Sequence, residues 1–439
     1  MPRSLPAGMI EALVHGFEET FPHVHLHLIV DLDGRIDRAA LVAAFRVLVA
    51  TFPVMGCRYA PAWWRDRWVP WDGDLADLVS VEEVEDVAAA TRSAVEARLP
   101  SSERPPVRLS AFLRGESTRL VLSVHHMVAD GGGLKAAGNV LAAALCGVPP
   151  DPPPSPERDL LQLARALRLR DLPVLVAELV REGTRPLWIL LARRISRDQD
   201  RGPGDPGPRW RTLTLEGAAA EGFVAACRSA GATVNDGLVA AVARLVAGRA
   251  VSGPVCAGFT VDLRRFLPGR RSLVTNLHGV SLVMLRRAVA VDPEKVLPAV
   301  IAAIGAQKRR LPGLAYTLLP ALALHPVPHA VLRVVGRPIL DNLARTLHRA
   351  LAVTNIGALD ETLAPFGARA RRASILGPFV HGLPVPIVTA TGFRGGLTLH
   401  VEGTGSLSDE ALDRFAVELG AALMPPRASP ARISAAEAP

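Results

Sequence analysis

Hydrophobic positions along the chain recur with the period of a strand in some segments and of a helix in others. Residues 24–32 form an apolar run that ends at Asp33 and Gly34, a pair typical of a turn, and this pattern predicts a strand. Four apolar side chains then recur on one helical face: Leu41, Phe45, Leu48 and Phe52. Asp37 is a suitable N-cap for this helix, and Pro53 is expected to end it.

The same alternation continues along the rest of the chain. Further strands are predicted at residues 107–113, 119–124, 210–215, 255–261, 277–286, 350–354, 384–390 and 396–402. Helices are predicted at 81–99, 134–146, 217–229, 237–248 and 293–310, within 314–350, and after Ser408. Because strands and helices alternate in both halves, the predicted fold class is α/β.

Two segments rich in proline and glycine divide the chain. Residues 147–158 are a stiff proline-rich connector, and residues 197–208 are a more flexible one. We therefore expect four parts: an N-terminal subdomain at 1–158, a basic helical insert with its linker at 159–208, a C-terminal subdomain at 209–424, and a disordered tail at 425–439.

Composition narrows the class of protein. With 439 residues, 49% of them hydrophobic, the chain can bury more than one core. Its four cysteines are widely spaced without a CxxC pair, so neither a zinc site nor a disulfide framework is predicted. The start of the chain lacks a signal-peptide pattern, and no run of 18 apolar residues occurs, so a cytoplasmic location is expected.

The net charge of +8 comes almost entirely from arginine, since the only lysines are Lys135, Lys295 and Lys308. The arginines are scattered and no RNA-binding motif lies among them, so nucleic acid is not an expected partner. Anionic small molecules, acidic proteins and anionic lipids remain open. The insert 159–196 mixes arginine with leucine, valine and tryptophan, which is typical either of a helix on a membrane surface or of one packed across the two halves.

Two further clusters have alternative interpretations. Four tryptophans lie within nine positions of a predicted surface strand pair and could form a platform for a ring or belong to ordinary packing: Trp63, Trp64, Trp68 and Trp71. His23, His25 and His27 alternate on one strand face and could bind a metal. They lack a further ligand at a diagnostic spacing, so no metal site is expected.

The most informative segment is 125–131, which follows an apolar strand and precedes an Ala/Leu-rich helix. It contains His125, His126, Asp130 and Gly131 in the pattern HHxxxDG. A histidine in such a turn can remain neutral and accept a proton from an attacking hydroxyl or amine. Asp130 is expected to pair with an arginine and brace the loop, and the candidate partners are Arg58 and Arg264.

This motif resembles the HHxxxDG motif of the CoA-dependent acyltransferase superfamily, which includes condensation domains, polyketide-associated acyltransferases and wax ester synthases. Supporting segments occur in the family's order at residues 33–37, 233–241, 261–265 and 354–357. The resemblance implies two chloramphenicol-acetyltransferase-like subdomains that form a V-shaped pseudo-dimer with a central tunnel. Motifs of plant members and of multimodular peptide synthetases are missing, which favours a free-standing bacterial acyltransferase in natural product biosynthesis.

By the same resemblance, His126 is the general base, His125 a structural neighbour, Asp130 the brace and Gly131 the turn. Thr354 and Asn355 are candidates for the donor that stabilises the oxyanion. No tightly bound cofactor is expected, and acyl-CoA or a phosphopantetheinyl thioester on a carrier protein would be the co-substrate.

The predicted reaction transfers an acyl group from that thioester to a hydroxyl of a hydrophobic acceptor, because residues 159–196 and 314–350 are strongly apolar. Two alternatives remain open. One is a free-standing condensation enzyme that forms an amide from an amine acceptor, and the other is a non-catalytic member that binds a carrier protein or, at the membrane periphery, lipid.

Overall fold

The computed structural model describes most of the chain. The described residues are 4–150, 158–168, 172–177, 207–249, 253–268, 273–308, 311–335, 350–380, 386–403, 407–424 and 432–434. Most of the two predicted connectors and of the basic insert lies outside these residues, and so does most of the predicted tail.

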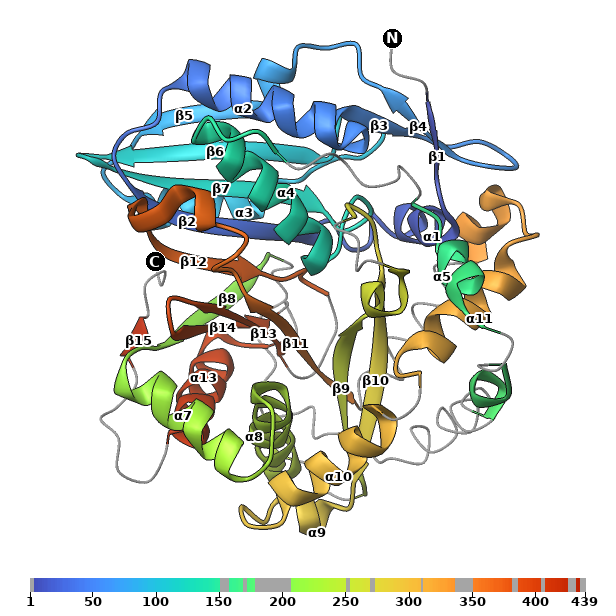
Figure 1. The fold of residues 1–439 in the computed structure, drawn as a ribbon, viewed down its shortest axis with the longest axis vertical. Helices are drawn as coiled ribbons and strands as arrows, with labels where there is room; N and C mark the ends of the chain where they lie inside the picture. Colours follow the sequence, from blue (N-terminus) through green and yellow to red (C-terminus); the bar gives the residue numbers. More distant parts are fainter. Residues whose placement is uncertain are drawn as a thin grey trace.

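A five-stranded sheet forms the N-terminal part of the molecule (Figure 1). Its strands, in spatial order, are β12 (Ala370–Leu376), β2 (His25–Asp33), β7 (Ser117–His125), β6 (Val107–Arg114) and β5 (Val79–Glu83). Helices α2 (Arg38–Thr51) and α4 (Gly131–Leu145) cover one face, and α3 (Val87–Glu96) packs on the other. Asp37 caps α2 as predicted, because its carboxylate accepts a hydrogen bond from Ala40 N at 2.8 Å.

A seven-stranded sheet forms the C-terminal part. Its strands, in spatial order, are β10 (His278–Leu285), β9 (Val255–Asp262), β11 (Ala350–Ala358), β13 (Ile387–Phe393), β14 (Gly396–Gly403), β8 (Arg209–Leu215) and β15 (Arg432–Ser434). The helices that share its core are α7 (Ala218–Ser229), α8 (Val234–Arg249), α9 (Arg287–Ala290), α10 (Val296–Lys308) and α13 (Asp409–Leu423). The predicted α/β class with two sheet-rich parts is therefore confirmed.

The remaining elements gather at one side of the molecule (Figure 1). They are α1 (Met9–Gly16), α5 (Leu161–Ala166), α11 (Leu314–Leu324), and a small sheet of β1 (Leu5–Pro6), β4 (Arg67–Pro70) and β3 (Cys57–Ala60). Short 3-10 helices occur at Pro53–Gly56, Leu75–Leu78, Leu263–Phe266 and Ala364–Arg369. Among the described helices, no single helix is long and apolar enough to cross a membrane. Helices α7 and α8 reach the required length and apolar composition only when they are taken together, and the angle between them is 97°.

The structure differs from the predicted organisation at three places. Strand β12 lies within the predicted subdomain 209–424 but pairs antiparallel with β2 in the N-terminal sheet. Residues 432–434 of the predicted tail pair with β8. The helix predicted at 81–99 begins only after Asp86, whose carboxylate caps α3, because residues 79–83 pair with β6 as a strand. Short strands with few apolar positions leave too weak a pattern to be recognised in a sequence.

A layer of buried polar side chains lies between the two sheets. The alternation of β2 directs Leu26, Leu28 and Val30 into the core beneath α2 and α4, so His25 and His27 occupy the opposite face. On β14, Leu399 and Val401 likewise enter the C-terminal core, and His400 and Glu402 lie on the other face. The charge of His400 contributes to lowering the pKa of His27, so these two polar faces lie near each other.

Burial keeps this layer uncharged near neutral pH. It lowers the pKa of His27 to about 3 and that of His400 to about 4, because the charged imidazolium would lose its hydration. Burial also raises the pKa of Glu402 to about 8, although Gly377 N and the Thr389 hydroxyl donate hydrogen bonds to its carboxyl group. The two sheets therefore meet across neutral polar groups at pH 7.

We expect Glu402→Gln to make the thermal midpoint of unfolding less sensitive to alkaline pH. The carboxyl group is neutral in the fold up to about pH 8 but ionises near 4.5 when unfolded, so the stability it contributes at low pH is lost as pH rises through this window. Glutamine has the shape of the protonated carboxyl group but does not ionise. The variant therefore does not lose stability as the pH rises. Calorimetry at pH 5 and pH 8.5 checks this, with the exposed Glu103→Gln as control. Parallel pH profiles of Glu402→Gln and wild type would contradict it.

Candidate active site

The HHxxxDG segment connects the end of β7 to the start of α4. His125 is the last residue of β7 and lies opposite His25 of β2, and His126 N donates a hydrogen bond to Val24 O at 2.9 Å. Asp130 then caps α4 by accepting a hydrogen bond from Gly133 N at 2.8 Å. Both ends of the segment are thus fixed by regular structure, and the residues between them have little freedom.

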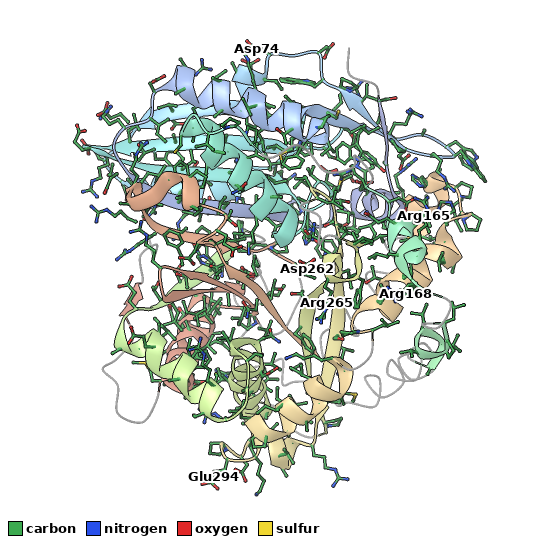
Figure 2. The ribbon with its side chains drawn as sticks, viewed as in Figure 1. Asp74, Arg165, Arg168, Asp262, Arg265 and Glu294 are labelled. Carbon is green, nitrogen blue, oxygen red and sulfur yellow. The ribbon has the colours of Figure 1, made fainter. Side chains whose placement is uncertain are left out.

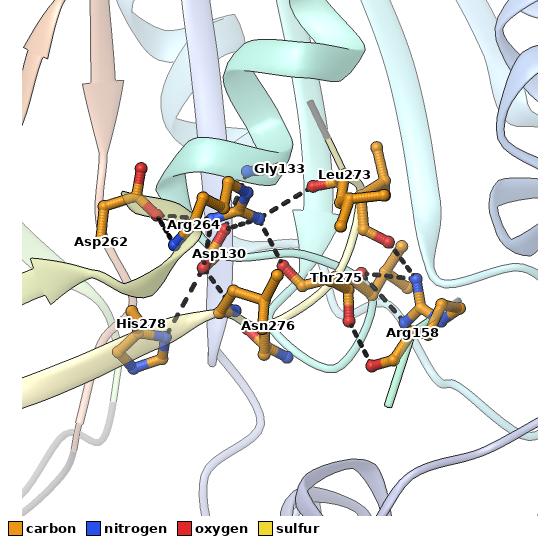
Figure 3. Close-up of polar contacts among 12 residues, drawn as sticks. Asp130, Gly133, Arg158, Asp262, Arg264, Leu273, Thr275, Asn276 and His278 are labelled. Carbon is orange, nitrogen blue, oxygen red and sulfur yellow. Dashed lines mark hydrogen bonds and ion pairs between the residues drawn. The ribbon is translucent and has the colours of Figure 1, made fainter. Parts of the chain in front are cut away.

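Asp130 forms a buried ion pair with Arg264 of the C-terminal part. The guanidinium donates through Nη2 to Oδ1 at 2.8 Å and through Nη1 to Oδ2 at 3.0 Å, a bidentate arrangement. Asp262, which caps the 3-10 turn that contains Arg264, and Arg265 of the same turn lie at the centre of the molecule in Figure 2. Arg264 Nη2 also donates to the carbonyls of Leu273 and Thr275, as Figure 3 shows.

The ion pair determines the charge of Asp130. Burial alone would raise the pKa of this carboxyl, but the Arg264 guanidinium and its hydrogen bonds hold the pKa at about 2. Leu277 N also donates to Oδ2, at 2.8 Å. Asp130 is therefore an anion with its oxygens fully occupied, and it braces the loop rather than exchanging protons with a substrate.

Glycines after Asp130 make the close approach possible. A Cβ atom on Gly132 would lie 2.6 Å from Arg264 Nη1, and one on Gly131 would lie 3.1 Å from Ile356 Cδ1. A side chain at Gly132 would displace the guanidinium that pairs with Asp130. Gly131 is the first residue of α4, so the turn that the motif implied is the start of a capped helix.

Arg264, and not Arg58, is the partner of Asp130. Arg58 lies on β3 in the small sheet, where it pairs with Val69, and its side chain has no hydrogen bond or ion pair with another described residue. Arg264 follows directly after β9, whose neighbour β10 reaches the HHxxxDG turn. The spacing along the sequence could not distinguish the two arginines, because the choice depends on how the two sheets pack.

Asn276 binds the ring and the backbone of the second motif histidine. The distance between His126 Nδ1 and Asn276 Oδ1 is 3.0 Å. The Asn276 amide nitrogen donates to His126 O and, at 3.3 Å, to Met127 O. The His278 ring lies 5.2 Å from the His126 ring, centroid to centroid. His126 is half-buried, and it is the motif residue whose ring is directed toward the C-terminal part.

His125 occupies a different environment. It is fully buried, its Nδ1 accepts a hydrogen bond from Met127 N at 3.1 Å, and its ring packs against His25. Burial lowers the pKa of His125 to about 4. A neutral, enclosed ring of this kind supports the loop and has no access to a substrate.

A cavity of about 250 Å³ reaches Asn276 from the side of the molecule where α1, α5 and α11 meet. The apolar side chains of Met9, Ile10, Leu160 and Ala321 form part of its wall, together with the charged Glu11 and Asp159, and Arg65 and His325 lie toward the exposed side. The Arg158 guanidinium, which binds Glu11 and the Val128 carbonyl, closes one side. A ligand in this cavity would lie next to the residue that holds His126.

The other predicted site residues, Thr354 and Asn355, have no hydrogen bond to the HHxxxDG segment among the described residues. Thr354 and Asn355 are half-buried on β11, and Asn355 Oδ1 accepts a hydrogen bond from Gly357 N at 3.0 Å. Ile356, between them and Gly357, packs over Gly131, so this segment borders the motif turn. Their role toward an oxyanion stays a prediction.

His25 and His27 share one face of β2, and His23 lies just before the strand. The ring centroids of His23 and His25 are 6.2 Å apart, and those of His25 and His27 are 6.1 Å apart. The described residues contain no group of three or more potential metal ligands in binding geometry.

Sequence reasoning missed Asn276, His278 and Arg158. The first two are polar residues at the start of an otherwise apolar strand, which is a recognisable signal, since a polar residue at a strand end often serves a site. Arg158 is the last residue of the predicted proline-rich connector, and its position in the sequence gave no such signal.

The fold and this arrangement define the class of protein to which the chain is similar. It has the fold shared by condensation domains and a trichothecene acetyltransferase, which is the fold that the HHxxxDG resemblance implied. No family model matches the chain. An uncharacterized protein of Mycobacterium tuberculosis is 29% identical over 402 residues, covering 88% of this chain and 91% of the relative.

Among solved structures, trichothecene 15-O-acetyltransferase from Fusarium sporotrichioides superposes with a TM-score of 0.70 at 13% identity, covering 96% of each chain. The first condensation domain of the calcium-dependent antibiotic synthetase gives 0.67 at 18% identity, covering 98% of this chain and 99% of the domain. SgcC5 from Streptomyces globisporus, in complex with a naphthyl ethanediol, gives 0.66 at 16% identity, covering 95% and 98%.

Arg264→Met is expected to lower the free energy of unfolding by about 3 to 5 kcal/mol, because it leaves the Asp130 carboxylate buried without its counter-ion. Urea unfolding measures this change. Arg58→Met is the matched control and should shift the free energy by less than about 1 kcal/mol. Equal stability of the two variants would contradict the assignment of Arg264 as the partner.

Proposed function

We propose that the protein is an acyltransferase that moves an acyl group from a thioester of CoA or of a carrier protein to the hydroxyl group of a hydrophobic acceptor. The observation that carries the proposal is the contact between His126 Nδ1 and Asn276 Oδ1, which prepares one imidazole as a general base. Epimerization domains and X-domains share this fold with condensation domains. The fold alone therefore does not indicate the reaction, and the proposal rests on the residues of the site.

The hydrogen bonds of Asn276 define the tautomer of His126. The carbonyl oxygens of His126 and Met127 only accept hydrogen bonds, so the Asn276 amide nitrogen faces them. Asn276 Oδ1 then faces the ring and also only accepts, which requires the proton on Nδ1 of His126. In the neutral ring the lone pair is on Nε2, and this atom is the base.

The proposed reaction needs no covalent enzyme intermediate. Nε2 of His126 removes the proton of the acceptor hydroxyl while its oxygen attacks the thioester carbonyl carbon. The tetrahedral intermediate collapses by breaking the C–S bond, and the imidazolium returns the proton to the departing thiolate. The products are an ester and a free thiol, and the enzyme ends in its starting protonation state. Thr354 and Asn355 are the proposed region for stabilising the oxyanion.

The apolar part of the cavity wall, formed by Met9, Ile10, Leu160 and Ala321, supports a hydrophobic acceptor. A hydroxyl acceptor is supported by two structural neighbours, an O-acetyltransferase and a protein solved with a diol. Condensation domains among the neighbours support a carrier-bound thioester as an alternative to CoA and keep amide formation as the second candidate. We further propose that the reaction takes place in the cytoplasm without a tightly bound cofactor.

His126→Ala should reduce acceptor-dependent thiol release by about 100-fold or more, because the base is removed while the fold is kept. Thiol release from a panel of acyl-CoA donors, acetyl to palmitoyl, is measured with medium-chain alcohols and amines, and a carrier-bound donor is the next arm. Faster release with amines than with alcohols would favour amide formation. Full activity of the variant would contradict a role for His126, and no release with any donor would favour a non-catalytic binding protein.

Asn276→Ala should lower kcat by about 10- to 100-fold with little change in KM, because His126 is then free to adopt the Nε2-protonated tautomer. Asn139→Ala, which removes an amide bound to the Glu361 and Thr362 carbonyls, is the matched control. Proton–nitrogen spectra of histidine-labelled protein, assigned with His126→Ala, report the tautomer directly. An unchanged tautomer in Asn276→Ala would contradict the positioning role.

A further inference from the structure

Two adjacent tryptophans project from the molecule at the turn between β3 and β4. Trp63 is 71% exposed and Trp64 is 55% exposed, whereas Trp68, on β4 in the same hairpin, is completely buried. The four clustered tryptophans thus divide into packing residues and a pair in contact with solvent. Large apolar side chains gathered on a surface commonly mark a site of interaction.

The backbone of this turn is held rigidly, so the exposure of the two indoles is built into the fold. Trp63 O accepts a hydrogen bond from Ala330 N, and Trp64 O accepts one from His329 N, each at 3.1 Å. Asp66 is fully buried and binds His329 and Arg333. Both tryptophan carbonyls are therefore tied to the C-terminal part while the rings point outward.

The segment that holds the turn adds further apolar surface. Residues 329–335 are helical, and Val331 and Val334 lie exposed on them, Val334 by 73%. We define the tryptophan face as Trp63, Trp64, Val331 and Val334.

Arginines lie beside this face. Arg65 lies with its guanidinium 5.3 Å from the centre of the Trp64 ring, and Arg67 is exposed on β4. Residues 61–68 contain one acidic side chain, Asp66, which is buried. Arg165 of α5 and Arg168, which follows this helix, are exposed and lie on the same side of the molecule as α11 (Figure 2). The face is therefore apolar at its centre and positive at its rim.

We propose that the tryptophan face docks on an anionic lipid bilayer. Tryptophan rings favour the level of the headgroups, where the indole body is in apolar contact and its N–H remains hydrated. Arginines at the rim match anionic headgroups. Arg65 also lines the cavity that reaches Asn276, so docking would place the cavity near the membrane surface, from which a hydrophobic acceptor could enter.

Vesicle flotation tests this inference without acyl transfer, so its result is independent of the proposed function. The probes are phosphatidylcholine vesicles with and without about 30% phosphatidylglycerol. Wild type should bind the anionic vesicles, and Trp63→Ala/Trp64→Ala should bind them at least about 10-fold more weakly. The control is Val291→Ala/Val417→Ala, which removes exposed apolar side chains near α9 and on α13 and should bind as wild type does.

Acyl transfer to a soluble alcohol should be unchanged in the tryptophan variant, and circular dichroism should show that it is folded. The inference would be overturned if the tryptophan variant bound the anionic vesicles as well as the valine control variant does. It would also be overturned if the wild-type protein bound neither kind of vesicle. Tryptophan-dependent binding to an acidic carrier protein, with no binding to vesicles, would also overturn it and identify the face as a protein-docking surface.

Discussion

The buried ion pair between Asp130 and Arg264 connects the two parts of the molecule at the point where chemistry is proposed. Its carboxylate caps α4, its guanidinium follows β9, and backbone groups of residues 273–277 complete the network. A buried pair of this kind fixes relative position more than it adds stability, because both charges have lost their hydration. As a result, β10 and Asn276, which lies just before it, are held in a fixed position beside the HHxxxDG turn.

The rest of the interface depends on neutrality. His27, His400 and Glu402 lie between the sheets, and burial keeps each of them uncharged near pH 7. Asp130 and Arg264 thus form a strongly charged contact at the centre, whereas the layer formed by His27, His400 and Glu402 is polar and uncharged. Asp130 is paired with Arg264, and the ring of His126 contacts the neutral side chain of Asn276 instead.

Much of the fold was predictable from residue patterns, since the strands and helices with strong periodicity, such as α2 with its Asp37 cap, formed as expected. The motif itself identified His126 and Asp130. Strand β12 was not predictable, because it changes sheets with only a few apolar residues, and the choice of Arg264 over Arg58 required the packing of two distant segments. Asn276 was missed for the same reason, because its partner is 150 residues away.

The central claim is that an acceptor hydroxyl, activated by His126, attacks the thioester carbonyl. The most direct test is mass spectrometry of the product formed from an oxygen-18-labelled alcohol by wild type and by His126→Gln. The account predicts an ester that retains the label in its bridging oxygen and that forms with wild type but only in traces with the variant. An unlabelled product, or equal ester formation by both proteins, would contradict it.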